Sequence, residues 1–285
     1  MLPSSDYKAF RDTLASSQRV VILTGAGLSV ASGIPTFREP NGLWKYAPLK
    51  SSLQFDPQDE FKQDPSRIWQ FYHCIRQSSN AAHNVIASLA LPADRSQLMA
   101  ASASGKPPLL ITQNFDGLSF RALNALASQF DPAELKIARE CIIEMHGSIN
   151  KTHSLDAEFS PALSRITETD MGELVIPVGQ LSRCGGPHWN GSNRFGRCGG
   201  LHRPAVVWFS EVPEGMGEIA KGLNWTDLLI IVHPAAWFAT SVKHRGGKIA
   251  VFNLEPSLAD EHADFLFIGP CEVTLPSILG VEISK

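Results

Sequence analysis

The chain reads GAGLSVASGIPTFR over residues 25–38, directly after the short apolar run 19–23. A buried strand that ends in a glycine turn and continues into a helix is the simplest interpretation of this stretch. Glycines at such a turn let backbone amides approach a pyrophosphate, and the amino end of the helix adds a favourable partial charge. The stretch therefore predicts a strand–turn–helix unit that binds a nucleotide.

The spacing differs from that of the common dehydrogenase fingerprint. That fingerprint needs a third small residue three positions after Gly27, and Val30 stands there. No clear second strand ending in an acidic residue follows about twenty residues later. A hydride-transfer enzyme is therefore disfavoured, although the glycines alone are also compatible with an ordinary tight turn.

Further apolar runs indicate an α/β fold. Runs like 19–23 recur at 109–112, 141–145, 205–209, 227–232, 248–254 and 264–268, and helices are expected between several of them, for example at 119–129. Alternating buried strands and helices are typical of a parallel sheet covered on both faces. We predict a single domain, 1–285, whose Rossmann-like core comprises 14–146 and 204–275.

Two stretches interrupt this alternation. The first, at about 39–105, predicts a helical insertion with helices near 65–78 and 81–91. The second, 147–203, is poor in apolar periodicity, and its part 183–200 contains six glycines and two cysteines. The second stretch therefore predicts a small, loop-rich module rather than a layer of the sheet.

Composition and charge narrow the function classes. The formal net charge of -3 makes direct nucleic-acid binding a poor first expectation. Five widely spaced cysteines do not form a dense disulfide framework, which favours a reducing, intracellular compartment. No apolar run is long enough to span a bilayer, and residues 1–18 lack the apolar stretch of a secretory signal. Cytoplasm, nucleus and mitochondrion stay open.

Four segments in order resemble the signatures of the sirtuin family. They are the stretch 25–38, TQNFDGL at 112–118, EMHGS at 144–148 and PAVVWFSE at 204–211. The resemblance runs from about residue 19 to about residue 276. It looks closest to the class III group, the acidic-acyl deacylases, through FYH at 71–73 and GPC at 269–271.

The resemblance implies an NAD-dependent protein-lysine deacylase, acting as a deacetylase, desuccinylase or demalonylase on acylated lysines of proteins. In this family the acyl oxygen attacks the nicotinamide ribose and nicotinamide leaves. His146 would then deprotonate a ribose hydroxyl, a role that suits an imidazole with an unperturbed pKa near ~6.5. The ribose hydroxyl captures the acyl group, and O-acyl-ADP-ribose and deacylated lysine depart.

The resemblance also assigns the binding residues. Asn114 and Asp116 follow a strand at the edge where α/β sheets bind ligands, and an amide beside a carboxylate suits a carboxamide. The same pair is equally compatible with capping a helix. The implied NAD-binding set is Gly25, Ala26, Gly27, Ser29, Ile34, Phe37, Arg38, Trp44, Gln113, Asn114, Asp116, Asn253, Glu255 and Cys271. The implied substrate set is Tyr72, Arg76, Val207, Trp208 and Phe209.

One departure concerns zinc. Sirtuins usually carry two cysteine pairs that close a tetrahedral zinc site. Here KTHS at 151–154 stands in place of the first pair, and only Cys184 and Cys198 remain. His153 and His188 are compatible with completing a two-cysteine, two-histidine set, and two free thiols are at least as compatible with this sequence. Zinc binding is thus an open expectation for a degenerate module.

Two further departures concern the ligands. Sirtuins normally show a Gly-Thr-Ser-Ser turn that contacts the NAD phosphates, whereas here IVHPAA at 231–236 runs directly onward, so weaker NAD binding is expected. Class III members bind acidic acyl groups with Tyr-x-x-Arg, whereas Ile75 stands three positions after Tyr72 and Arg76 stands four after it. Both spacings share a helix face, so Arg76 stays a candidate.

These departures keep two other functions in view. The first is a catalytically weak NAD-binding or interaction protein that retains the fold, which the missing phosphate turn and cysteine pair favour. The second is mono-ADP-ribosyl transfer, which uses the same glycosidic chemistry with another nucleophile. The four ordered signatures favour the deacylase.

Overall fold

The computed structural model describes residues 2–36, 57–99, 105–152, 176–185, 199–208, 211–213, 215–235 and 238–281. The chain divides into two compact units. The sheet unit comprises Met1–Thr36, Gln77–Met145 and Glu214–Lys285, and the small unit comprises Phe37–Arg76 and His146–Pro213. The predicted helical insertion is thus shared between the two units.

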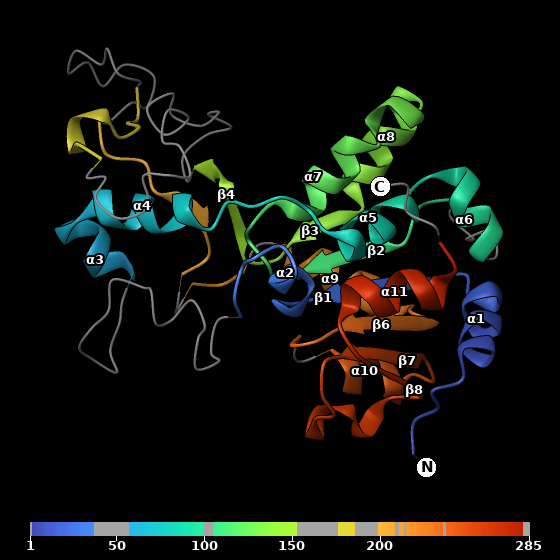
Figure 1. The fold of residues 1–285 in the computed structure, drawn as a ribbon. Helices are drawn as coiled ribbons and strands as arrows, with labels where there is room; N and C mark the ends of the chain where they lie inside the picture. Colours follow the sequence, from blue (N-terminus) through green and yellow to red (C-terminus); the bar gives the residue numbers. More distant parts are fainter. Residues whose placement is uncertain are drawn as a thin grey trace. The chain divides into compact units, whose positions relative to one another are not determined.

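A six-stranded parallel sheet forms the centre of the sheet unit (Figure 1). Its strands are, in spatial order, β3 (Ile142–Glu144), β2 (Leu109–Thr112), β1 (Val20–Thr24), β6 (Leu228–Val232), β7 (Lys248–Asn253) and β8 (Phe265–Ile268). All neighbouring pairs run parallel. The predicted α/β, Rossmann-like sheet is confirmed.

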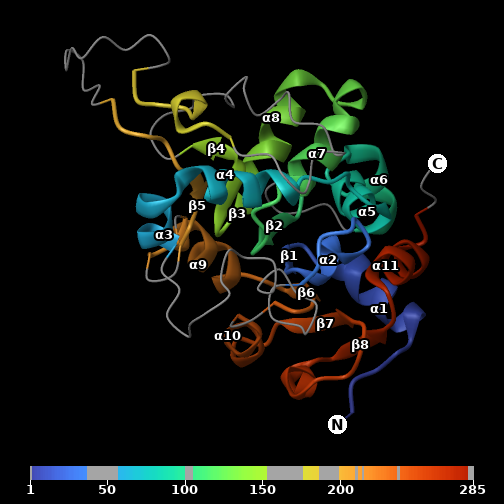
Figure 2. The ribbon, with the colours of Figure 1, turned by 60° about the vertical axis from the view of Figure 1, so that its left-hand side comes forward.

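Both faces of this sheet are buried under helices, as the apolar runs predict. Along β1, Val20 and Ile22 belong to one core cluster, and Val21 and Leu23 belong to the other, because successive side chains of a strand point to opposite faces. Helices α1 (Tyr7–Ser16), α5 (Ala81–Ser88) and α11 (Cys271–Leu279) supply the first cluster (Figure 2). Helices α9 (Met216–Asn224) and α10 (Ala239–His244) supply the second.

The remaining helices of the sheet unit lie at its edges and connections. They are α2 (Gly27–Val30), α6 (Pro92–Leu98), α7 (Leu118–Ala125), α8 (Pro132–Glu140), η2 (Ala127–Gln129) and η7 (Leu258–His262). One of them, α8, begins at Asp131, whose side chain accepts the Ala133 N–H of the first turn at 2.8 Å, and Asn80 likewise accepts the Ala82 N–H at 2.9 Å at the start of α5. The helices predicted at 81–91 and 119–129 correspond to α5 and to α7 with η2.

The small unit contains α3 (Pro57–Gln63), α4 (Pro65–Cys74), η5 (Val178–Gln180) and two antiparallel strands, β4 (Gly147–Thr152) and β5 (Pro204–Val206). Buried Trp69, Ile176 and Leu181 form its core. The run 205–209 was expected to join the parallel sheet, but β5 pairs with β4 instead. The pattern did not predict β4, because its sequence GSINKT is polar at most positions.

None of the described helices is long and apolar enough to cross a membrane.

Candidate active site

The predicted nucleotide site lies at the carboxyl edge of the sheet. Thr24 at the end of β1 is in register with Thr112 of β2 and with Val232 of β6. The glycine turn, the segment after β2 and the segment after β6 therefore leave the sheet at the same edge. Open α/β sheets bind ligands at this edge.

A hydrogen-bonded network joins the glycine turn to the segment after β2. The Ser29 hydroxyl donates to Asp116 Oδ2 over 2.6 Å. Asn114 Nδ2 donates to Ser29 Oγ and to the Gly25 carbonyl, both over 3.0 Å. Ser29 is almost fully buried, so these bonds form in a medium of low dielectric constant. Four residues that the sequence assigned to NAD binding are thus brought together.

The Asp116 carboxylate also binds the backbone at the start of α7. Its Oδ1 accepts the Leu118 N–H at 2.9 Å and so satisfies a donor in the first turn of α7. Both interpretations of this aspartate, as a ligand-facing carboxylate and as a helix cap, are therefore compatible with the structure. Burial raises the pKa of Asp116, and the bonds from Ser29 and Leu118 oppose that rise.

His83 completes this network, and the sequence did not single it out. Its Nε2 lies 3.4 Å from Ser29 Oγ, and its Nδ1 accepts the Asn80 N–H at 3.3 Å. An accepting Nδ1 leaves the proton of the neutral ring on Nε2, which faces Ser29. Burial lowers the pKa of His83 to about 4, so the ring is uncharged at neutral pH. The only sequence signal was its place three residues after the helix-capping Asn80.

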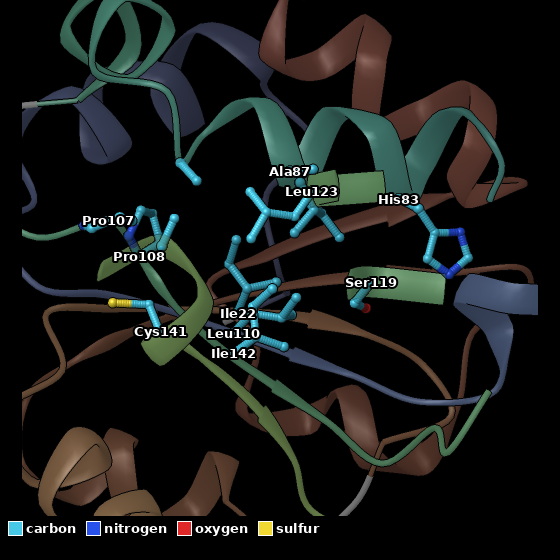
Figure 3. Close-up of a pocket in the computed structure, with 13 residues that line it drawn as sticks. Ile22, His83, Ala87, Pro107, Pro108, Leu110, Ser119, Leu123, Cys141 and Ile142 are labelled. Carbon is cyan, nitrogen blue, oxygen red and sulfur yellow. The ribbon is translucent and has the colours of Figure 1, made fainter. Parts of the chain in front are cut away.

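His83 also reaches a pocket beneath the network. The pocket lies between the sheet and the helices α5, α7 and α8. His83 and Ser119 lie at one end, and Cys141 with Pro107 and Pro108 lies at the other (Figure 3). The lining between these ends is aliphatic, so the pocket offers few polar partners to a ligand.

The segment after β6 packs directly on the glycine turn. A Cβ atom on Gly25 would lie 1.7 Å from the Pro234 carbonyl oxygen, and one on Gly27 would lie 1.9 Å from the His233 carbonyl oxygen. The Gly25 N–H donates to the Val232 carbonyl at 3.0 Å. This close packing by itself requires glycine at both positions. It also places two carbonyl oxygens at the turn predicted to meet phosphates.

Other predicted NAD-binding residues lie around the same edge. The buried Ile34 donates its N–H to the Ser29 carbonyl at 3.3 Å, and Gln113 donates its N–H to the Thr24 carbonyl at 2.8 Å. Cys271, at the start of α11, points its thiol at the Gly27 carbonyl over 3.4 Å. Asn253 ends β7, and the exposed Glu255 follows it. Ala26 lies in the turn, and Phe37, Arg38 and Trp44 lie outside the described residues.

His146 is the first residue of the second segment of the small unit. Its carbonyl accepts the Val207 N–H at 2.9 Å, which ties it to the predicted substrate segment. Gly147 makes this approach possible, because it has a φ of +77° and a Cβ there would lie 1.9 Å from the Ala205 carbonyl oxygen. Trp208 is buried, and Phe209 lies outside the described residues.

The two predicted acyl-binding side chains lie on and just after α4. Tyr72 is buried, and that burial raises its pKa to about 12. Arg76 donates through Nη2 to the Ile149 carbonyl of β4 over 3.2 Å. Ile75, at the third position after Tyr72, is buried. The Arg76 guanidinium is thus engaged with the backbone of its own unit.

Of the four residues considered as zinc ligands, Cys184 is among the described residues. Cys184 is buried, and its N–H and carbonyl bond to the backbone of Gly200 and Gly199. Cys198, His153 and His188 lie outside the described residues. Within the described ranges, no group of three or more His, Cys, Asp or Glu side chains is arranged to hold a metal ion. Zinc binding therefore stays a prediction.

Comparison with known proteins decides the family. The sequence pattern described as the Sir2 family matches residues 25–236, which include the glycine turn, Asn114, Asp116 and His146. The chain belongs to the Sir2 family. The sirtuin resemblance on which the site assignment was based is thereby confirmed.

Sir2-family relatives match over nearly the whole chain. An NAD-dependent protein deacylase of Daphnia pulex is 36% identical and covers 98% of each chain. The mitochondrial NAD-dependent protein deacylase sirtuin-5A of Xenopus laevis is 33% identical over 98% of this chain and 86% of its own. An NAD-dependent protein deacetylase of Saccharolobus solfataricus is 30% identical over 96% of both chains.

Solved Sir2 structures share the fold. A Sir2 homologue in complex with NAD superposes with a TM-score of 0.65 at 26% identity, covering 98% of this chain and 95% of the other. A mutant Sir2 homologue bound to ADP-ribose superposes with a TM-score of 0.66 at 25% identity, covering 97% and 99%. The Rossmann-like architecture is thus that of structures which hold NAD or its ADP-ribose part.

Proposed function

We propose that this chain is an NAD-dependent protein-lysine deacylase that releases nicotinamide and O-acyl-ADP-ribose. The observation that carries the proposal is the network of Ser29, Asn114 and Asp116 beside the glycine turn, at the ligand-binding edge of a parallel sheet. Its donors and acceptors suit a carboxamide. Membership of the Sir2 family and the deacylase relatives support the same reaction class and NAD as its co-substrate.

The orientation of Asn114 follows from its bonds. The amide nitrogen donates to the Gly25 carbonyl and to Ser29 Oγ, which accounts for both of its hydrogens. The amide oxygen is then the atom that Asn114 offers to the N–H of a ligand. Asp116 adds a half-buried carboxylate whose direction is set by Ser29 and Leu118. NAD, when bound, supplies the ribose carbon that the acyl oxygen attacks and the nicotinamide that leaves.

The small unit provides the proton acceptor and the substrate segment. We assign His146 as the base that takes a proton from a ribose hydroxyl, as the sirtuin resemblance implies. Val207 to Phe209 would pair with the backbone of a protein substrate around its acylated lysine. The bond from the Val207 N–H to the His146 carbonyl supports this assignment, because it connects the two directly.

The choice of acyl group depends on Tyr72 and Arg76. With its pKa raised to about 12, Tyr72 keeps its hydroxyl proton at neutral pH and offers it as a donor. Arg76 would have to exchange its bond with the Ile149 carbonyl for a bond with an acidic acyl group. The enzyme is therefore expected to remove acetyl groups at least as readily as malonyl or succinyl groups.

The proposal is tested by nicotinamide release. The purified chain is incubated with NAD and with acetyl-, malonyl- or succinyl-lysine peptides of one sequence, and nicotinamide is quantified. We expect peptide-dependent release that falls by a factor on the order of 10² to 10⁴ in His146→Ala, while NAD binding measured by calorimetry persists. Absence of release with every peptide at saturating NAD would reject the deacylase.

The cysteines are relevant to the compartment of the protein and to a candidate zinc site. Among the described residues, Cys141 and Cys271 are free cysteines, which supports a reducing, intracellular location. Zinc, if bound, would use Cys184 and Cys198 for structure rather than chemistry. Metal analysis of the purified chain, with and without Cys184→Ser, tests that assignment.

A further inference from the structure

Arg203 lies directly before the signature segment 204–211 and forms a cluster with residues of that segment beside β5. Its Nη2 lies 2.7 Å from Glu211 Oε1, and its Nη1 donates to the Val206 carbonyl over 3.2 Å. Its guanidinium carbon lies 3.9 Å from the centre of a Trp208 ring. The side chains of Arg203 and Glu211 are only 16% and 25% exposed, so water and salt screen this ion pair weakly.

Glu211 holds the same piece of backbone from the other side. Its Oε2 accepts the Trp208 N–H at 2.8 Å, and its own N–H donates to the Trp208 carbonyl at 3.0 Å. Arg203 binds the residue before Val207, and Glu211 binds the residue after it. The ion pair between them therefore clamps the backbone on both sides of Val207.

The clamped backbone is also connected to the proposed base. Val207 lies between the two clamped residues, and its N–H donates to the His146 carbonyl at 2.9 Å. Val206 is buried at 3% exposure and Trp208 at 5%, so the segment cannot shift without unpacking both residues. Arg203 and Glu211 thus set where this segment lies relative to His146.

We infer that Arg203 and Glu211 are positioning residues for the acylated substrate. They hold the Val206–Trp208 backbone in the place where it pairs with the peptide, so binding does not have to order it. The inference rests on the proposed function, which assigns this segment to the peptide and His146 to the proton transfer. The clamp holds the segment assigned to the peptide, and the Ser29, Asn114 and Asp116 network belongs to the sheet unit, so we expect the clamp to act on peptide binding.

Two variants test the clamp through the Michaelis constants of the two substrates. Glu211→Gln keeps the size of the side chain and removes its charge, and we expect a roughly tenfold rise in KM for an acetyl-lysine peptide with KM for NAD unchanged. Arg203→Lys keeps the charge but loses the planar fork and the stacking on Trp208, so a smaller rise is expected. Asp59→Asn is the matched control, because it breaks an exposed ion pair with Lys62 in the same unit.

The outcomes separate positioning from general damage. An unchanged peptide KM in folded Glu211→Gln and Arg203→Lys proteins would overturn the inference, and so would a parallel rise of both Michaelis constants. If Glu211→Gln does not fold, Arg203→Lys is judged by the same criteria. If the unmodified chain turns over no acyl peptide, the deacylase proposal fails by itself. Binding of a labelled acetyl-lysine peptide, measured by fluorescence anisotropy, then tests the clamp: weaker binding in the variants supports it, and equal binding overturns it.

Discussion

Ser29, Asn114 and Asp116 at the edge of the sheet are short side chains on or beside regular elements, whereas Arg203 and Glu211 in the small unit are long charged side chains eight residues apart that contact each other. The first group is held by hydrogen bonds among buried Ser29 and half-buried Asn114 and Asp116, with one carboxylate at its centre. The second is held by a charge pair that remains in partial contact with water. The position of the sheet-edge group is therefore fixed by hydrogen bonds between short side chains and the backbone of the glycine turn. The position of the small-unit group is fixed mainly by an ion pair.

The largest effect is expected when the Asp116 carboxylate is replaced by an amide. In Asp116→Asn the side chain keeps its shape, but an amide nitrogen can replace one of the two oxygens that face Ser29 and Leu118. We expect nicotinamide release to fall on the order of 10²-fold or more, because an electrostatic partner of the reacting group is lost.

Asp12→Asn is the control for Asp116→Asn, since Asp12 is an exposed aspartate of the same unit that pairs with Lys8. Its turnover should match that of the unmodified chain. Full activity in Asp116→Asn would show that this carboxylate has no part in the reaction.

The next largest effect is expected where the glycine turn packs closely on the segment after β6. Gly25→Ala would bring a Cβ to 1.7 Å from the Pro234 carbonyl oxygen, which is backbone and cannot rotate away. We expect the free energy of unfolding to fall by about 2 to 4 kcal/mol. Chemical denaturation gives this quantity.

Gly217→Ala provides the opposite result for comparison. Gly217 lies inside α9, and nothing lies within 4 Å of a Cβ built there. Alanine should raise the free energy of unfolding by about 0.5 to 1 kcal/mol, because it restricts the unfolded chain and favours the helix. Equal effects at the two glycines would contradict the close packing at Gly25.

The third prediction concerns His83, which lies beside Ser29: its contribution to the free energy of unfolding depends on pH. Burial lowers the pKa of His83 to about 4, below the ordinary value of 6.5 that it has in the unfolded chain. The unfolded state therefore binds the proton first as the pH falls. The His83 contribution to stability is complete above pH 6.5 and is lost as the pH falls toward 4. Its full size is about 3 kcal/mol at most.

The His83 contribution is isolated by subtraction. The free energy of unfolding of the unmodified chain and of His83→Gln is measured across this pH range by denaturant titration. The difference between the two should shrink as the pH falls. A constant difference would mean that the ring is protonated in the folded protein already.

The smallest effect is expected at the exposed Lys62–Asp59 ion pair, which serves as a comparison for the Arg203–Glu211 pair. The Lys62–Asp59 pair is 72% and 64% exposed, in contrast to the shielded Arg203–Glu211 pair. Asp59→Asn should therefore change the free energy of unfolding by about 0.5 kcal/mol or less. Thermal unfolding at low and high salt measures it, and a loss as large as that of Glu211→Gln would remove the distinction between the two pairs.

Much of the sheet unit could be predicted from the sequence because its strands are buried on both faces and read as continuous apolar runs, such as VVILT in β1 and LLIIV in β6. The network around Ser29 was predicted in its members, since their motif resembles a known signature. His83 was not, because a histidine in a helix carries no local mark of what it faces.

The small unit was less predictable for a physical reason. Strand β4 is short, polar and paired with one neighbour only, so its backbone bonds with β5 define it and its side chains do not. The same holds for Arg203 and Glu211. They are eight residues apart with ordinary surface chemistry, and only the fold of the intervening chain brings them into contact.

The order of strands in the sheet has a consequence for synthesis. Strand β1 emerges early from the ribosome, but one of its two partners, β6, follows about two hundred residues later, after the whole small unit. Until then β1 can pair only with β2, and one of its edges stays open. Chains of this kind are slow to close and prone to wrong strand pairing while they wait. A premature stop before β6 would therefore release an unpaired apolar edge, and we expect such fragments to aggregate rather than to retain part of the fold.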